Sequence, residues 1–396
     1  MSTFDVLVSE ARVGTLEHFE DDARSVFAFD PMWLADPDRP TLGLFFEDRR
    51  PRTIEVSGPI CWFAHLLPQG PLRRAIARQS STDEGDVFGL LAALADDLPG
   101  AVVLRPGSSP TRRPSRASGQ PATTGRLRFS LAGAQWKLSL RTSDRGFVVP
   151  VQGEEGAWIA KFHDPRFPAL PRVERATMEW ARRAGIEVPP FRIGRVEEIM
   201  DLPAVIPAGD GSVFLIERFD RRPGGGRIHI EDFGQVLDRP PGDAQYRGDY
   251  EELAAVLAAV APEDLRAFCE RLVFSALAGN TDAHLKNWSL IYPDGRSARL
   301  APAYDLVSTV VYRGKVEDEL ALALGRSKRF EDVDEASFRR LAAVCSRDFA
   351  EVRGWVNAAA ERVRAAWGEE GRELGFEADE RQAIERHLDR VPLGRR

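Results

Sequence analysis

The chain has 396 residues, of which 43% are hydrophobic and 29% are charged, as is typical of a soluble globular protein with two or three domains. A net charge of -7 disfavours a protein that coats nucleic acid or anionic membrane by itself. Three widely separated cysteines, Cys61, Cys269 and Cys345, have no metal-ligand spacing and favour buried thiols in a reducing compartment. With no leader pattern and no window approaching 18 apolar residues, the sequence predicts a cytoplasmic protein without membrane contact.

Residues 1–104 are predicted to form a small α+β module. Residues 4–8 and 26–29 have the pattern of strands, and Gly14 and residues 20–22 have the pattern of turns between them. Three apolar runs at helical spacing follow, at residues 62–67, 72–78 and 86–98. The module shows no catalytic pair of residues.

Residues 105–126 are predicted to be a linker or loop. The stretch 105–128 carries six arginines and no acidic residue among Ser, Thr, Gly and Pro, so little of it can be buried. A phosphate-binding arm is the alternative interpretation. Loss of affinity for a nucleic-acid partner on deletion of residues 112–116 would support that alternative.

Two lobes of different composition are predicted after the linker. Residues 127–220 contain strand-like runs at 127–131, 136–140, 147–151, 157–162 and 213–219, with one helix at about 172–184. Residues 221–396 are mainly helical in pattern. The order predicts a β-rich lobe followed by an α-helical lobe.

A polar loop in the second lobe carries the strongest chemical signal. Asp282 and Asn287 are separated by four residues, between an apolar helical run and a short strand. This is the order of a phosphotransferase catalytic loop, in which the Asp accepts the hydroxyl proton and the Asn binds magnesium. Asp305, in an apolar segment downstream, is costly to bury without a cation and is predicted to be the second metal ligand. The alternative, a polar turn that ends a helix, does not explain Asp305.

A lysine in an apolar strand is the candidate phosphate contact. Lys161 lies in the run A-W-I-A-K-F, where an unpaired ammonium group would be costly to bury. Glu174, near the start of the next helix, is its predicted partner. Taken alone, the lysine could be a plain exposed residue.

Two segments are candidates for binding the rest of a nucleotide. Ala132 and Gly133 would let backbone N–H groups approach a triphosphate, and Lys137 would add charge, although a hairpin turn is the alternative. Glu217 and Phe219 could present backbone groups to an adenine, although a buried strand ending in a charged turn fits equally well.

Two further residues of the polar loop complete the cofactor-binding candidates. His284 either orients Asp282 through a hydrogen bond or packs the loop, and packing is favoured. Lys286 directly precedes the predicted metal ligand Asn287.

Together these segments resemble the HipA family of serine/threonine kinases, the toxins of bacterial toxin–antitoxin modules. The motifs that carry the resemblance are S-L-A-G-A-Q-W-K, W-I-A-K-F, F-L-I-E-R-F-D-R, R-I-H-I-E-D-F-G-Q, G-N-T-D-A-H-L-K-N and L-A-P-A-Y-D-L, with W-F-A-H-L-L-P-Q-G-P-L-R upstream. The resemblance implies a two-lobed, protein-kinase-like α+β fold with an N-terminal accessory module. It also implies that Ser130 is a site of autophosphorylation. Gln69 and Trp136 depart from the family pattern.

The resemblance further implies ATP- and magnesium-dependent phosphorylation of a protein such as an aminoacyl-tRNA synthetase, with growth arrest as the result. The expected partner is a helix-turn-helix antitoxin that supplies the DNA contacts. A small-molecule phosphotransferase on the same fold and a non-catalytic regulatory binding module are the alternatives.

Overall fold

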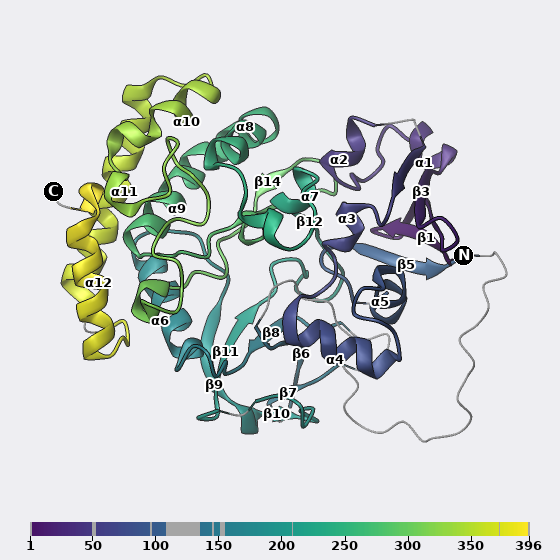
Figure 1. Cartoon of the computed structure of the whole chain (residues 1–396), viewed down its shortest axis with the longest axis horizontal. Helices are drawn as coiled ribbons and strands as arrows, with labels where there is room; N and C mark the ends of the chain where they lie inside the picture. Colours follow the sequence, from purple (N-terminus) through teal and green to yellow (C-terminus); the bar gives the residue numbers. More distant parts are fainter. Residues whose placement is uncertain are drawn as a thin grey trace.

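The computed structural model describes residues 2–49, 53–95, 97–107, 135–144, 146–150, 155–207, 209–371 and 373–394. Within these residues the chain forms an N-terminal module, a β-rich lobe and a helical lobe, and Figure 1 shows the module and the helical lobe at opposite ends of the molecule. The predicted strand at 127–131 and the loop with Ser130, Ala132 and Gly133 lie outside the described residues. The same holds for most of the predicted linker.

The N-terminal module is built on an antiparallel sheet of order β4-β3-β2-β1-β5. Its strands are β1 (Ser2–Val8), β2 (Ala11–Phe19), β3 (Arg24–Phe29), β4 (Ile54–Ser57) and β5 (Val102–Pro106). Its helices are α1 (Pro31–Ala35), α2 (Leu44–Glu47), α3 (Cys61–Ala64), α4 (Gly70–Ser80) and α5 (Val87–Leu94). The three predicted helical runs are confirmed with shifted ends, and Asp86 caps α5 by accepting from the amide of Gly89.

The predicted turn at Gly14 is wrong. Gly14 lies inside β2 and pairs with Val6 on one side and Phe29 on the other. A Cβ atom there would lie 2.3 Å from the carbonyl oxygen of Ala28. Glycine therefore permits a close approach of two backbones within a sheet rather than a reversal of the chain.

The β-rich lobe is a sheet of order β10-β7-β6-β8-β11-β9. Its strands are β6 (Lys137–Ser143), β7 (Gly146–Val148), β8 (Trp158–Lys161), β9 (Phe191–Arg195), β10 (Ile199–Met200) and β11 (Ser212–Glu217). Helix α6 (Leu170–Arg183) confirms the predicted helix at about 172–184. Its position after β8 brings the start of the helix close to the end of the strand that carries Lys161.

The helical lobe also contains a small sheet of order β12-β13-β14. These strands are β12 (His229–Asp232), β13 (Ser289–Tyr292) and β14 (Arg299–Leu300). The helices are α7 (Phe233–Val236), α8 (Tyr250–Val260), α9 (Leu265–Leu277), α10 (Arg339–Val344), α11 (Phe349–Glu370) and α12 (Ala378–Arg390). The polar loop runs from the end of α9 to the start of β13, so a buried helix and a buried strand fix both of its ends.

The buried apolar side chains form two clusters that do not follow the predicted seam. One cluster joins the module to the β-rich lobe, because Phe4, Trp62 and Leu104 belong to the same packed group as Leu140 and Leu215. The other fills the helical lobe and takes in the buried face of α6. The module and the β-rich lobe thus share one continuous core.

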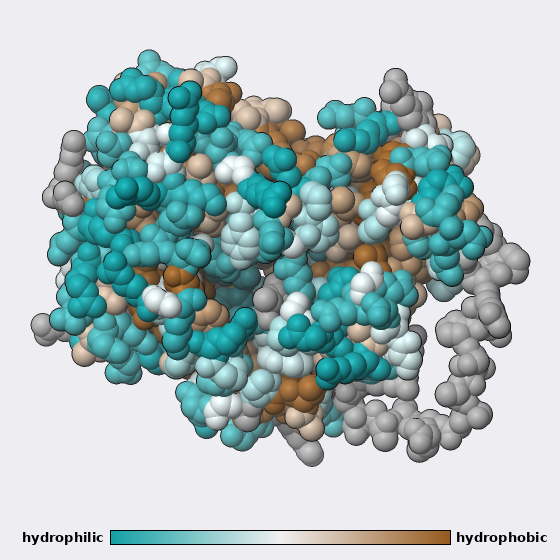
Figure 2. Space-filling model, in the orientation of Figure 1, coloured by the Kyte–Doolittle hydropathy of each residue, from teal (hydrophilic) through white to brown (hydrophobic). Residues whose placement is uncertain are grey.

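The surface agrees with a chain that buries its apolar residues. The face in Figure 2 is mainly hydrophilic, and hydrophobic residues break through only in separate patches. Within the described ranges, no helix is long and apolar enough to cross a membrane. Cys61, Cys269 and Cys345 are free thiols, and the last two are buried.

Candidate active site

The polar loop is held from several sides by hydrogen bonds to its backbone. The carbonyl oxygen of Ala283 accepts from the hydroxyl of Tyr250 at 3.1 Å and from the indole of Trp288 at 3.2 Å. The amide of Thr281 donates to the hydroxyl of Thr309 at 2.7 Å. These bonds stabilise the irregular backbone between α9 and β13, because they give its polar groups partners within the protein.

Asp282 is the exposed carboxylate of this loop. Its side chain is 53% exposed, and its Oδ1 atom accepts a hydrogen bond from the hydroxyl of Tyr246 at 2.8 Å. The Nε2 atom of His284 lies 3.8 Å from the same oxygen. No sequence pattern pointed to Tyr246, which contacts Asp282 from a turn 36 residues earlier in the chain.

The ring of His284 caps the 3-10 turn η4 (Leu285–Asn287). Its Nδ1 atom accepts from the amide of Lys286 at 3.2 Å, and its ring meets that of Tyr246 edge to face at 4.7 Å. Burial lowers the pKa of His284, so the ring is neutral near pH 7. The side chain of His284 therefore packs against Tyr246 and caps the turn, and it lies too far from Asp282 for a hydrogen bond.

Asn287 and Asp305 lie on the same side of the loop as Lys161. The amide nitrogen of the Asn287 side chain donates to the carbonyl of Asp282 at 2.6 Å, which leaves its Oδ1 atom available. Asp305 accepts a short hydrogen bond from the ammonium group of Lys161. Its φ angle of +54° is uncommon outside glycine and marks a backbone held in place by its surroundings.

Three buried charged residues surround the partly buried Asp305, and we call the four residues the lysine cluster: Lys137, Lys161, Glu174 and Asp305. Lys161 bonds both Glu174 and Asp305, whereas the sequence predicted Glu174 alone. The ammonium of Lys137 lies 4.0 Å from Asp305. The predicted partner of Lys161 is therefore present, and a second acid from the helical lobe joins it.

The lysine cluster has perturbed acid–base properties. Burial acts to raise the pKa of Asp305, but the charges of Lys161 and Lys137 outweigh it and lower that pKa. Burial raises the pKa of Glu174. Its Oε2 atom has no hydrogen-bond partner among the described residues. We conclude that Lys161 and Asp305 are the firmly charged pair of this cluster.

All described site candidates line one or both of two connected cavities of about 120 and about 500 Å³. Five residues line both cavities, namely Lys137, Lys161, His284, Asn287 and Asp305. Glu217, Phe219 and Lys286 line only the smaller cavity, and Glu174 and Asp282 line only the larger one. The structure thus brings together residues that are up to 168 positions apart, from Lys137 to Asp305.

Lys286 differs from the other candidates, because its ammonium group is already engaged. It donates to Asp232 at 2.6 Å and contacts the Nδ1 atom and the carbonyl of His65 at 2.9 and 3.1 Å. A single histidine after an apolar run, as His65 is, is more often a satisfied structural residue than a ligand. Its bonds are satisfied, but one of them reaches the candidate catalytic loop.

The segment after β11 follows the smaller cavity. The amides of Glu217 and Arg218 donate to the carbonyls of Pro190 and Ala157, each at 2.8 Å. The ring of Phe219 packs against Tyr304, with centroids 5.5 Å apart. A ligand in the cavity would meet the Glu217 carbonyl and the Phe219 backbone rather than those two amides.

A β-rich lobe and a helical lobe that meet at a site of this kind define a kinase-like fold. The model of the HipA-like C-terminal domain matches residues 129–367, and that of the HipA N-terminal domain matches residues 4–105. The chain belongs to the HipA family.

Two curated relatives and one solved structure cover between two thirds and all of its length. Y4dM of Sinorhizobium fredii is 36% identical over 408 residues, which cover 100% of this chain and 98% of Y4dM. The serine/threonine-protein kinase toxin HipA of Shewanella oneidensis is 27% identical over 301 residues, 66% of each chain. The solved structure of Shewanella oneidensis HipA with HipB and operator DNA has a TM-score of 0.71 at 21% identity and covers 97% of this chain and 94% of that one.

Proposed function

We propose that this chain is a serine/threonine protein kinase that uses ATP and Mg²⁺. The observation that supports the proposal is the convergence of Asp282, Asn287, Asp305 and Lys161 on two connected cavities. Phosphoryl transfer depends on positioning and charge neutralisation, and this set offers a base, oxygen ligands and a cation for those tasks.

Lys161 would contact the phosphates, and Glu174 would hold it in place. The ammonium group of Lys161 is buried and remains charged beside two carboxylates. Ala132 and Gly133 are proposed to cover the phosphates with their backbone, and Lys137 adds a second buried cation beside Asp305. Charge fixed in a dry site stabilises phosphate oxygens more than the same charge in water.

Asn287 and Asp305 would hold Mg²⁺. Their amide and carboxylate oxygens are the hard ligands that this ion prefers. No group of three or more His, Cys, Asp or Glu able to hold a metal occurs among the described residues. Two protein ligands suit Mg²⁺, which keeps several waters and phosphate oxygens in its shell. When bound, the ion neutralises charge on the phosphates.

Asp282 would accept the proton of the attacking hydroxyl. Its exposure leaves room for an acceptor side chain, and its backbone is fixed by the bond from Asn287. The Glu217 carbonyl and the Phe219 backbone would face the adenine. The ring of Tyr304 packs against the ring of Phe219. His284 and Lys286 would maintain the loop rather than touch phosphate.

The substrate class is proposed to be a component of translation, such as an aminoacyl-tRNA synthetase, with growth arrest as the outcome. A helix-turn-helix antitoxin is proposed as partner, and DNA would be contacted through it. The structural relative from Shewanella oneidensis, solved with HipB and operator DNA, supports an assembly of this kind.

Intact-mass measurement after incubation with Mg-ATP tests the proposal. The wild type should gain phosphate, whereas Asp282→Asn should not, and Asp243→Asn should behave as the wild type because Asp243 is exposed in the nearby turn. Loss of the added mass in Ser130→Ala would assign the autophosphorylation site. Labelled ATP in a lysate should mark a polypeptide band; labelling of a metabolite alone would instead support a small-molecule phosphotransferase.

Failure of the wild type to gain phosphate or to label any band would contradict the proposed kinase. If Mg-ATP also left the melting temperature unchanged, the non-catalytic binding module would be the better interpretation. Equal growth inhibition by the wild type and by Asp282→Asn would exclude toxicity through this chemistry.

A further inference from the structure

The N-terminal module forms part of the wall of the candidate nucleotide cavity. His65, Leu66 and Pro99 line the smaller cavity together with Lys161 and Asp305. The module also shares its apolar core with the β-rich lobe. A module that was only attached to the two lobes would not need to line the cavity between them. We therefore ask what its contacts with the cavity do.

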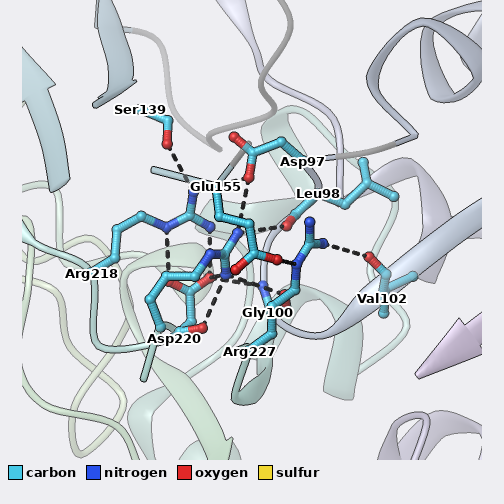
Figure 3. Close-up of polar contacts among 10 residues, drawn as sticks. Asp97, Leu98, Gly100, Val102, Ser139, Glu155, Arg218, Asp220 and Arg227 are labelled. Atoms are coloured by element: carbon cyan, nitrogen blue, oxygen red, sulfur yellow. Dashed lines mark hydrogen bonds and ion pairs between the residues drawn. The ribbon is translucent and has the colours of Figure 1, made fainter. Parts of the chain in front are cut away.

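The first contact is a group of buried charges behind the segment that carries Glu217 and Phe219. We call residues 217–221 the hinge, and Asp97, Arg218, Asp220 and Arg221 the hinge cluster. Figure 3 shows Asp97 from the module and Asp220 from that segment facing the guanidinium group of Arg218, with Ser139 of β6 beside it. The cluster therefore joins the module, the β-rich lobe and the hinge at one point.

The two carboxylates of the hinge cluster each accept hydrogen bonds from both arginines. Asp97 accepts from Arg221 at 2.9 Å and from Arg218 at 3.3 Å. Asp220 accepts from Arg218 at 2.7 Å, from Arg221 at 2.8 Å and from the amide of Gly100 at 2.9 Å. A Cβ atom at Gly100 would lie 2.8 Å from the amide nitrogen of Ile230, so only glycine fits there.

Because the hinge cluster is buried, its bonds hold the backbone in one position. All four side chains are 8% exposed or less, and two positive charges balance two negative ones. A buried ion pair contributes little net stability but is costly to break, because each partner would be left unpaired away from water. The hinge backbone at Arg218, Asp220 and Arg221 is therefore fixed to the module.

The second contact is on the catalytic loop, and we call His65, Asp232 and Lys286 the loop contact. The Nε2 atom of His65 donates to the carbonyl of Arg239 at 2.6 Å, which leaves Nδ1 to accept from Lys286 at 2.9 Å. Asp232 accepts from the same ammonium at 2.6 Å. The module thus holds the residue that directly precedes Asn287.

We propose that the N-terminal module fixes the hinge relative to the catalytic loop, with Asp97 and His65 as positioning residues for Mg-ATP. The inference rests on the proposed function. Because the hinge would face the base and the loop would face the phosphates of a bound nucleotide, the two contacts have different expected effects. Loosening the hinge should weaken nucleotide binding, and loosening the loop should slow phosphoryl transfer.

Asp97→Asn in the full chain tests the hinge. Calorimetric titration with Mg-ATP should show a dissociation constant raised about tenfold, within the range of coupling changes known for single residues. Glu155→Gln is the matched control, because it weakens a partly exposed ion pair with Arg227 near the same site, and Glu155 has no hydrogen bond or ion pair with Arg218 or Arg221 among those of the described residues. Equal affinity in the wild type and in Asp97→Asn, both folded at the temperature used, would overturn the proposal.

Hydrogen exchange without nucleotide separates this inference from the proposed function. Asp97→Asn should speed exchange of the amides of Glu217 and Arg218, and Glu155→Gln should not. Unchanged exchange in Asp97→Asn would overturn the inference even if ATP bound. A wild type that binds no Mg-ATP would overturn the proposed function and with it the assigned role of Asp97.

His65→Leu tests the loop contact, with His65→Gln as the conservative variant that keeps one donor and one acceptor. His65→Leu should lower the rate of self-phosphorylation at saturating Mg-ATP about tenfold with little change in the dissociation constant, and His65→Gln should restore part of the rate. A lower melting temperature of His65→Leu with an unchanged rate of self-phosphorylation would mean that His65 only stabilises the fold, and would overturn its positioning role.

Discussion

The hinge cluster and the lysine cluster each place two basic and two acidic side chains in the interior, yet their surroundings differ. In the hinge cluster, Asp220 accepts four hydrogen bonds from two arginines and one amide. In the lysine cluster, one oxygen of Glu174 has no partner among the described residues, and Asp305 is 26% exposed towards the cavities. Both carboxylate oxygens of Asp220 are bonded, and the Nε atom of Arg221 is the hinge cluster's unpartnered group among the described residues, whereas the lysine cluster has an unpartnered carboxylate oxygen beside a cavity.

The acid–base properties of the two clusters follow from this difference. Burial acts to raise the pKa of Asp220, but Arg218 and Arg221 outweigh it and lower that pKa strongly. In the lysine cluster, Lys161 and Lys137 likewise lower the pKa of Asp305, but at Glu174 burial outweighs the lysine charges and raises the pKa. Carboxylates bonded at both oxygens suit a structural contact, whereas a carboxylate with an unbonded oxygen beside a cavity suits a site that exchanges partners with a substrate.

The largest effect is expected from breaking the hinge cluster. Asp220→Ala would leave two buried guanidinium groups with Asp97 alone, and should lower the free energy of unfolding by about 3–5 kcal/mol. Denaturant unfolding followed by circular dichroism measures the change. Asp38→Ala removes the exposed pair with Arg296 and should leave the unfolding free energy nearly unchanged. A loss equal to that of Asp38→Ala would show that the hinge cluster is not a structural joint.

The matching change in the lysine cluster should affect catalysis instead. Asp305→Asn removes the carboxylate proposed to hold the metal and should reduce the rate of phosphoryl transfer by about 10²–10³-fold, or roughly 3–4 kcal/mol. Its unfolding free energy should change little, because Lys161 keeps Glu174. Asp318→Asn, which loosens an ion pair with Arg390, is the control. A normal rate with a large loss of stability would reverse the roles assigned to the two clusters.

A third buried carboxyl, Glu231, sharpens the comparison because it is bonded by neutral donors. It accepts from the amide of Leu44, the indole of Trp62 and the hydroxyl of Tyr292. Burial outweighs these bonds and raises the pKa of Glu231 from 4.5 to about 7. The folded state therefore holds a proton that the unfolded state releases between pH 4.5 and 7.

The sign of the pH dependence follows directly. A raised folded-state pKa contributes stability that is present in full below the unfolded-state pKa and is lost as pH rises through about 7. Between pH 5 and 8, the wild type should lose up to about 3 kcal/mol relative to Glu231→Gln. Unfolding free energies of both proteins at pH 5, 6.5 and 8 measure the difference. A constant difference across this range would mean that the neutral donors keep the carboxylate ionised.

Sequence reasoning found the local part of the site. Lys161 and Glu174 are 13 residues apart on consecutive elements, so an apolar strand followed by a helix was enough to predict their pairing. The placement of Asp305 beside Lys161 spans 144 residues and depended on the order of the motifs rather than on any local pattern. The chemical roles of these residues stay predictions.

The contacts of the module were beyond such reasoning. The run after β11 fitted a nucleotide contact and a charged turn at the end of a buried strand equally well. Neither interpretation predicted that Arg218 and Asp220 are buried, which depends on Asp97, about 120 positions upstream. The bond between His65 and Lys286 spans 221 residues. The role of Gly14 could not be predicted from a local pattern either, because its close approach to Ala28 depends on the pairing of β2 with β3.

The smallest effect is expected at the exposed end of the site, where Tyr246 bonds Asp282. Both side chains are partly exposed, so the hydrogen bond contributes about 1 kcal/mol at most. Tyr246→Phe should lower kcat/KM for phosphorylation about fivefold, because the Asp282 carboxylate loses one fixed orientation, and should lower the free energy of unfolding by no more than about 1 kcal/mol. Tyr312→Phe, which removes a hydroxyl bonded to the carbonyl of Pro168, is the control. An increase in kcat/KM would show instead that the Tyr246 hydroxyl occupies the position of the acceptor hydroxyl and must leave before a substrate binds.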